Sequence, residues 1–280
     1  MESFADVNGI KICYEIRGKE NSFPVILVHG FSAKKEAWVA QFGPLSEKLK
    51  VIRFDNRTAG KSDRPNQPLT AEIFADDLRG LMDYLNIEKA HVIGWSLGGI
   101  IVQHFALKYP ERLDRLVLIA TVMGSPDEQG VELLRKTWLE ELEQKKQDPE
   151  KTFWKSARLG FYIKFRKRMK ANPKKKFYDL WSVEDLIKDS ITDSSTPQDI
   201  INQSYAMLST ITLDNLRDIK SPTLLIAASH DRICAKSSMV EMHETIPNSI
   251  LKVIDKAGHS APVSRAPEVN KIIIEFLEKK

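Results

Sequence analysis

GWSLGG at residues 94–99 directly follows the apolar run AHVI at residues 90–93. A Gly-x-Ser-x-Gly turn between a buried strand and a helix holds its serine on a sharp, strained bend at the carboxyl edge of a sheet. The glycines are needed because neighbouring backbone approaches such a turn too closely for a Cβ atom. The pattern predicts that the hydroxyl of Ser96 is exposed at that edge. It becomes a nucleophile only if another part of the chain supplies a base.

Apolar runs alternate with helical patterns on both sides of this stretch. The pair Asn8-Gly9, between two short runs, predicts an N-terminal β-hairpin. Longer continuous apolar runs are typical of strands that are buried on both faces of a parallel sheet. They lie at residues 24–28, 51–54, 90–93, 115–120, 222–227 and 250–254. Helices are expected at residues 38–49, 70–85, 97–109, 236–245 and 267–277.

The alternation stops between residues 122 and 212, where helical patterns predominate and no strand is expected. Strand–helix alternation interrupted by a helical block predicts an α/β fold, a doubly wound and mostly parallel sheet with an inserted helical cap. The expected boundaries are residues 1–121 and 213–280 for the core and residues 122–212 for the cap.

Composition restricts the class of protein. With 280 residues, 42% hydrophobic content and a net charge of +4, the chain can bury one large core, and its charge is too small to indicate nucleic acid as a partner. We see no secretory signal and no apolar run of the ~20 residues that span a bilayer. Cys13 and Cys234 are far apart and not in metal-ligand spacing, which favours free thiols in a reducing compartment. We therefore expect a cytoplasmic protein without a metal or cofactor.

Two later strands are each followed by a side chain that Ser96 needs. The run at residues 250–254 leads into Asp255-Lys-Ala-Gly-His259, and the strand before it leads into Ser-His-Asp231. Because the carboxyl ends of strands gather the functional groups of a doubly wound sheet, we expect His259 to be the general base and Asp231 the acid that orients it. Asp255 and Asp127 are the alternatives for the acid.

The serine turn, the strand ends at Asp231 and His259, and two further motifs, HGF at residues 29–31 and DNRTAGKS at residues 55–62, occur together in this chain. In these motifs the chain resembles the α/β-hydrolase fold superfamily, in its cap-bearing branch of small esterases, lactonases and carbon–carbon hydrolases. The resemblance covers nearly all of the chain outside the cap. It implies an oxyanion hole made by the backbone N–H groups of Phe31 and Leu97. The departures from the family pattern are Thr58 for a common glycine, Ala228 and Cys234 where glycine and proline are common, and Ser264 for a frequent glutamate.

We expect a serine hydrolase that cleaves small-molecule carboxylic esters or lactones through an acyl-enzyme. Trp95 and Trp38, together with Phe31 and aromatic residues of the cap, are expected to line an apolar pocket. His29 is expected to hold the oxyanion loop, and Asp55 and Arg57 to brace the loop that follows their strand. Relatives with the same triad also hydrolyse carbon–carbon bonds, form peracids or cleave amides, and some are ligand receptors with slow turnover. Acyl specificity and oligomeric state are not predicted.

Residues 151–176 contain eleven Lys and Arg side chains and no acidic one, interleaved with aromatic residues. A basic amphipathic segment is typical of contact with an anionic membrane, and it also attracts carboxylate-bearing substrates. The interpretation we favour is a solvated face of the cap, whose charges meet acidic residues in the flanking segments 140–150 and 179–189.

Overall fold

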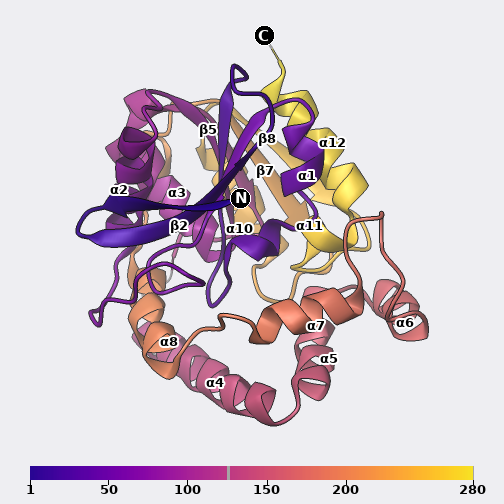
Figure 1. Cartoon of the computed structure of the whole chain (residues 1–280). Helices are drawn as coiled ribbons and strands as arrows, with labels where there is room; N and C mark the ends of the chain where they lie inside the picture. Colours follow the sequence, from indigo (N-terminus) through magenta and orange to yellow (C-terminus); the bar gives the residue numbers. More distant parts are fainter. Residues whose placement is uncertain (125–126, 280) are drawn as a thin grey trace.

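A computed structural model describes residues 1–124 and 127–279 and contains an eight-stranded sheet (Figure 1). The strand order is β1-β2-β4-β3-β5-β6-β7-β8, in which β3 to β8 run parallel, β2 is antiparallel to β4, and β1 is antiparallel to β2. The strands are β1 (Glu2–Val7), β2 (Ile10–Arg17), β3 (Pro24–Val28), β4 (Lys50–Phe54), β5 (Ala90–Trp95), β6 (Leu113–Ile119), β7 (Thr223–Ala228) and β8 (Ser249–Ile254). The predicted hairpin turns at Asn8 and Gly9, both with positive φ, as a two-residue hairpin loop requires.

Alternating side chains of the parallel strands build two apolar layers, one on each face of the sheet. In β3, Ile26 and Val28 enter one layer, whereas Val25 and Leu27 enter the other, and all four are fully buried. The first layer is covered by α2 (Ala71–Tyr84), α3 (Leu97–Lys108) and α10 (Lys236–Thr245). The second is covered by α1 (Phe42–Ser46) and α12 (Ala266–Leu277), and Figure 1 shows the two groups of helices on opposite faces. The predicted doubly wound α/β fold is confirmed.

The helix expected at residues 38–49 is shorter than predicted. The structure has a 3-10 turn, η1 (Lys35–Trp38), and then the short helix α1. Pro44 has no N–H to donate to the carbonyl of Ala40, so a regular α-helix cannot run through from residue 38. The other short elements outside the β6–β7 connection are η2 (Pro110–Arg112) and α11 (Ala261–Ser264).

The connection between β6 and β7 is helical in its described part, as predicted. It consists of α4 (Glu128–Gln147), α5 (Pro149–Gly160), α6 (Ile163–Ala171), α7 (Val183–Ile191), α8 (Pro197–Ser204), η3 (Tyr205–Leu208) and α9 (Leu213–Leu216). Figure 1 shows α4 to α8 gathered beyond one edge of the sheet. These helices have an aromatic core of their own, which includes Phe161, Phe165, Phe177 and Trp181. Within the part of the chain that the structure describes, no helix is both long and apolar enough to span a bilayer.

The strand order fixes where a site can form. β3 lies between β4 and β5, so the chain leaves β3 toward one side of the sheet and later returns on its other side. Such a switch point opens a crevice at the carboxyl ends of the two strands. The loop that carries Phe31 follows β3, and Ser96 follows β5, so both lie at this crevice.

Candidate active site

Ser96 stands between β5 and α3 with φ 58° and ψ −123°, a conformation that non-glycine residues rarely adopt. Its N–H donates to the carbonyl oxygen of Ile119 at 3.0 Å, and its own carbonyl accepts from the hydroxyl of Thr121 at 2.7 Å. These bonds attach the turn to the neighbouring strand β6. The strained serine turn expected from residues 94–99 is therefore present, and hydrogen bonds hold both the N–H and the carbonyl of Ser96.

Two glycines allow the backbone to approach this turn. A Cβ atom on Gly98 would overlap the main-chain carbonyl of Val28, so the start of α3 can pack on β3 only without a side chain there. A Cβ atom on Gly30 would lie 3.1 Å from the Cβ of Ser96. The loop after β3 thus lies directly against the serine.

His29 holds that loop, as predicted. Its Nδ1 lies 2.9 Å from the carbonyl oxygen of Gly30, and its Nε2 lies 3.0 Å from the backbone N–H of Asn56. A carbonyl only accepts and an N–H only donates, so this pair of bonds requires a neutral ring with its proton on Nδ1. Burial also lowers the pKa of His29, because burial disfavours the charged form. His29 is therefore bonded as a structural histidine, with neither nitrogen left to act as a base.

The backbone N–H groups of Phe31 and Leu97 have no hydrogen-bond partner among the described residues. Both groups belong to segments packed around Ser96, one in the loop after β3 and one at the first residue of α3. The ring of Phe31 packs edge-on against Trp138 of α4, with centroids 5.2 Å apart. Two free donors beside a strained serine are what an oxyanion hole requires.

Asp231 and His259 are in direct contact. Nδ1 of His259 lies 2.9 Å from Oδ2 of Asp231, whose side chain is 1% exposed. The other carboxylate oxygen accepts from the N–H groups of Ile233 and Cys234 at 2.8 and 2.9 Å. The carboxylate is therefore fixed on one side and accepts from the imidazole on the other, which leaves Nε2 of His259 as the nitrogen available to a reacting group.

The two alternative acids lie elsewhere. Asp255 has a 70% exposed side chain and pairs with Lys256 at 3.3 Å. Asp127 accepts from the N–H of Gly130 and caps the start of α4. Of the three aspartates that the sequence left open, Asp231 is the one hydrogen-bonded to His259.

The serine turn and the histidine loop are also connected through Trp95. Its indole N–H donates to the carbonyl oxygen of His259 at 3.2 Å, and the two rings lie 6.1 Å apart. Among the described residues, no hydrogen bond joins the Ser96 hydroxyl to the His259 ring. Hydrogen bonds of this kind often tighten only in the substrate complex.

Cys234 is a component of the site that sequence reasoning missed. The thiol interacts with the Ser96 hydroxyl, and both side chains line the same cavity. Burial raises the pKa of the thiol, the charge of Asp231 raises it further, and the contact with Ser96 opposes this rise. Cys234 is therefore a neutral, weakly polar wall of the site.

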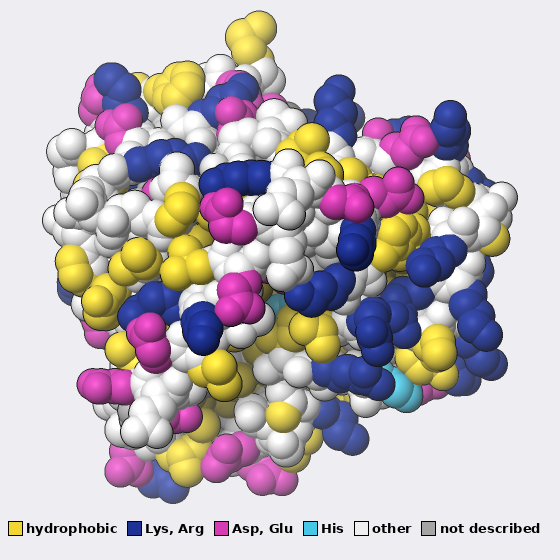
Figure 2. Space-filling view, turned by 90° about the horizontal axis from the view of Figure 1, so that it is seen from below, with side chains coloured by type: hydrophobic (Ala, Val, Ile, Leu, Met, Phe, Trp, Pro, Cys, Tyr) yellow, Lys and Arg dark blue, Asp and Glu magenta, His cyan; other side chains and the backbone are white. Residues whose placement is uncertain are grey.

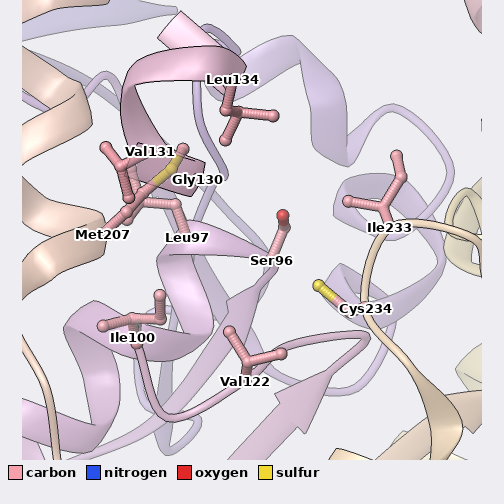
Figure 3. A pocket seen from close by; sticks show the side chains of 11 residues that line it. Ser96, Leu97, Ile100, Val122, Gly130, Val131, Leu134, Met207, Ile233 and Cys234 are labelled. Carbon is pink, nitrogen blue, oxygen red and sulfur yellow. The ribbon is translucent and has the colours of Figure 1, made fainter. Parts of the chain in front are cut away.

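A cavity of about 270 Å³ opens beside Ser96. Figure 3 shows the Ser96 hydroxyl pointing into the space between α4 on one side and the segment of Ile233 and Cys234 on the other. Apart from Ser96 and two glycines, the lining side chains are apolar or, in Cys234, weakly polar. The cavity is lined by Ser96, Leu97, Ile100, Val122, Gly124, Gly130, Val131, Leu134, Met207, Ile233 and Cys234. It suits an apolar group attached to a carbonyl at the serine.

Trp38 and Trp95, which we expected to line the pocket, are not among these lining residues, and neither is Phe31. Trp38 is fully buried and packs against Trp95, with ring centroids 5.9 Å apart. These large rings belong to the layer that supports the serine turn from behind. The expectation is corrected because Trp38 is buried in the core, and the half-buried Trp95 packs against it and donates to the carbonyl of His259 instead of lining the cavity.

The loop after β4 is braced as predicted. The carboxylate of Asp55 accepts from the N–H groups of Lys35 and Lys61 at 2.7 and 3.0 Å. Arg57 forms a two-point ion pair with Asp77 of α2, and both side chains are almost fully buried. These contacts hold the loop beside the loop of His29, and neither Asp55 nor Arg57 lines the cavity. The described residues contain no group of three or more His, Cys, Asp or Glu side chains that could hold a metal ion.

Comparison with known proteins gives an independent result. Residues 24–266 match the family model described as alpha/beta hydrolase fold. The chain is similar to a poly(3-hydroxyalkanoate) depolymerase of Ectopseudomonas oleovorans, with 28% identity over 265 residues that cover 94% of this chain and 87% of the relative.

Two solved structures have the same architecture. A thermophilic esterase from Thermogutta terrifontis is 26% identical, with a TM-score of 0.81 and coverage of 99% of this chain and 98% of the esterase. The enol-lactonase from Burkholderia xenovorans LB400 also has a TM-score of 0.81, with coverage of 99% and 100%. At 23% identity, this second likeness shows the fold alone.

Proposed function

This chain belongs to the alpha/beta hydrolase fold family as a hydrolase, and we propose that it cleaves carboxylic esters or lactones through Ser96, His259 and Asp231. The observation that carries the proposal is the 2.9 Å bond between Nδ1 of His259 and Asp231, whose carboxylate also accepts from the N–H of Cys234, a residue that lines the same cavity as the strained Ser96. The similarity to a solved esterase at 26% identity supports this class of substrate.

In the proposed reaction, His259 accepts the proton of Ser96 as the hydroxyl oxygen attacks the carbonyl carbon. Asp231 holds the imidazole in the required tautomer and stabilises its charged form. The N–H groups of Phe31 and Leu97 donate to the developing oxyanion, and each such donor contributes about 3 kcal/mol to lowering the barrier. His259 then protonates the leaving alcohol, and water hydrolyses the acyl-enzyme by the reverse sequence of proton transfers.

We propose that the acyl group occupies the apolar cavity, because this part of the substrate stays attached to Ser96 in an acyl-enzyme. The lining from α3, α4 and η3 supports an unbranched or lightly branched hydrocarbon chain over a polar group. Since Val131 and Leu134 of α4 form part of the wall, we propose that residues 122–212 act as a cap over a core of residues 1–121 and 213–280.

The free, buried state of Cys13 and Cys234 supports a reducing compartment, and we propose a cytoplasmic location on this ground. Buried thiols of this kind are inert packing residues in a reduced protein.

The test is labelling with a fluorophosphonate probe, together with turnover of p-nitrophenyl esters. Wild-type protein should label at Ser96 and turn over the esters. Ser96→Ala should lose both, with a fall in kcat of about 10⁶, while its thermal unfolding stays cooperative. Ser229→Ala is the matched control, since this serine contacts His230 and Asp255 and lies outside the cavity lining. Turnover in Ser96→Ala comparable to that of wild type would refute the assignment.

Ester and lactone substrates should be compared with vinylogous diketones, which report carbon–carbon hydrolysis. The proposal expects the first two classes to be turned over faster, because a simple apolar cavity offers a diketone no polar partner other than the oxyanion donors. A preference for diketones would replace the ester assignment while leaving the roles of Ser96 and His259 intact.

A further inference from the structure

The basic segment 151–176 keeps most of its charge unpaired. Ion pairs with acidic residues of the flanking segments form only at its C-terminal end, where Lys174 lies 3.9 Å from Glu184 and Lys176 pairs with Asp185. Within the described residues, no carboxylate comes within 4 Å of the other basic side chains of this segment. They are Lys151, Lys155, Arg158, Lys164, Arg166, Lys167, Arg168, Lys170 and Lys175. The expected neutralisation by flanking acids is therefore wrong for this part of the surface.

Four of these side chains converge on a cleft between α5 and α6. The cleft has a volume of about 310 Å³ and is lined by Trp154, Arg158, Ile163, Arg166, Lys167 and Lys170, with no acidic residue among them. The Nε atom of Arg166 is shielded from solvent and has no hydrogen-bond partner among the described residues. Burial lowers the pKa of Arg166, and the nearby charges of Arg158 and Arg232 lower it further. Crowded cations with a free donor favour an anion in the cleft.

Apolar side chains stand exposed beside these cations. Leu159, Ile163 and Ile233 are 47%, 51% and 48% exposed, and Ile233 also lines the cavity of Ser96. Figure 2 shows the molecule from this side, with Lys and Arg side chains gathered next to a hollow where hydrophobic side chains are visible. A soluble anion would leave such aliphatic side chains in water, whereas a lipid surface would bury them.

The basic corner is also in contact with the loops of the active site. The carbonyl of Gly160, at the end of α5, accepts from the N–H of Ser260 at 2.8 Å. The ring of Tyr162 packs against His230 with centroids 4.6 Å apart. The basic cleft therefore lies next to the segments that carry Asp231 and His259, and a surface held there is close to the cavity.

We propose that this face, formed by α5, α6 and the loop of Arg232 and Ile233, docks on an anionic phospholipid surface, with a headgroup phosphate in the cleft between α5 and α6. The cations match the negative charge, and the aliphatic side chains enter the interfacial layer. Delivery of an ester from the lipid to Ser96 rests on the proposed function, but docking itself does not. Nucleic acid shares the phosphate but gains nothing from exposed aliphatic side chains.

The test is co-sedimentation of the full chain with vesicles of phosphatidylcholine alone and of phosphatidylcholine with 30 mol% phosphatidylglycerol, a composition chosen for the assay. Binding should require the anionic lipid and weaken as salt is raised. Each basic residue near an anionic surface strengthens partitioning about fivefold, so the triple variant Arg158→Gln, Arg166→Gln, Lys167→Gln should bind about 100-fold more weakly.

A matched triple variant, Lys19→Gln, Lys89→Gln, Lys220→Gln, removes three exposed lysines that precede β3, β5 and β7. These positions lie at the amino ends of the parallel strands, at the opposite edge of the sheet from the site. Both triple variants lower the net charge from +4 to +1 (4 − 3 = 1). The control should keep the binding of wild type to within a few fold, because its lysines do not face the lipid.

Three outcomes would overturn the proposal. They are equal binding to vesicles with and without phosphatidylglycerol, equal losses in the two triple variants, and complete release by a few millimolar inorganic phosphate, which would indicate a soluble phosphate ligand. Tighter binding to duplex DNA than to vesicles at equal phosphate concentration would assign the face to nucleic acid instead. Since sedimentation needs no catalysis, absent vesicle binding with normal ester turnover refutes docking alone.

A second variant separates the apolar contribution from charge. Leu159→Ser with Ile163→Ser changes two exposed positions, so folding should be preserved, and thermal unfolding checks this. This variant should bind anionic vesicles more weakly with an unchanged salt dependence. An unchanged affinity for anionic vesicles would show that only charge contributes to binding at this face. It would refute entry of the aliphatic side chains into the lipid.

Discussion

Val131→Phe should shorten the acyl chain that this protein prefers. Val131 lies on α4, is 4% exposed and lines the cavity of about 270 Å³ beside Ser96. A protein cavity of 150 Å³ accommodates benzene, or about 25 Å³ for each carbon atom. The cavity therefore holds about eleven carbons of substrate. Phenylalanine has four more carbons than valine, which on the same measure removes about 100 Å³, so the longest acyl chain that fits should fall by about four carbons.

The size of the effect follows from burial of methylene groups. Each buried CH₂ is worth about 0.8 kcal/mol, or roughly a fourfold gain in kcat/KM per added carbon until the cavity is full. With p-nitrophenyl esters of two to sixteen carbons, which bracket this length, wild-type protein should peak at about eleven carbons and Val131→Phe at about seven. Four lost methylenes correspond to about 3 kcal/mol, so the ratio of kcat/KM for the eleven-carbon and seven-carbon esters should drop roughly 200-fold.

Val131→Ile is the matched control, since one added carbon should move the optimum by about one position. Overpacking costs about 1 to 3 kcal/mol, so thermal unfolding of each variant should be recorded beside its kinetics. An unchanged length profile in Val131→Phe would refute placement of the acyl chain in this cavity. A uniform fall at every chain length would also contradict it, because blocking the end of a cavity spares short substrates.

Three further changes test the framework of the site. Gly98→Ala should lower the melting temperature and abolish fluorophosphonate labelling, because the added Cβ meets a β3 carbonyl; helix propensity alone predicts the opposite, a gain of about 1 kcal/mol. Asp77→Ala should cost about 3 to 5 kcal/mol in urea unfolding, because it leaves the charge of Arg57 buried and unpaired; a loss below 1 kcal/mol would contradict this. The bond from Lys61 lowers the pKa of Glu2 to about 2, so its stabilisation is complete above about pH 4.5 and is lost as the pH falls toward 2. Glu2→Gln should therefore show a smaller loss of stability on acidification in urea melts at pH 3 and pH 6, and an equal loss would contradict the assignment.

The sequence predicts most of the core because local patterns determine it. The bounds of β3 agree with the expected run at residues 24–28, since a short, continuous apolar run is typical of a parallel strand that is buried on both faces. The helix expected at residues 70–85 starts where predicted, since the side chain of Thr70 accepts from the N–H of Ile73 and caps the start of α2. Where one local rule opposed another, as at Pro44 within a helical pattern, the prediction was wrong.

The cavity could not be predicted, because its wall is assembled from segments far apart in the chain. Val131 of α4 and Met207 of η3 have no local pattern that separates a cavity wall from a packed core. Cys234 did have a signal, since it stands where the family commonly has proline. A proline has no N–H, whereas the N–H of Cys234 donates to Asp231 at 2.9 Å. This departure gives the carboxylate a second backbone donor and also places a thiol against Ser96.

The charge of the basic segment illustrates why distance along the chain does not predict neutralisation. Acidic residues precede it closely, but Glu143 pairs with Lys146 at 2.6 Å on its own helix, and Glu141 accepts from the neutral hydroxyl of Ser156 on α5 at 2.7 Å. A carboxylate and a cation three or four residues apart on one helix lie close together, so such local pairs form easily. Within the described residues, no carboxylate comes within 4 Å of the basic side chains of α5 and α6. Their mutual repulsion remains in the free protein, and an external anion that relieves it binds more tightly for that reason.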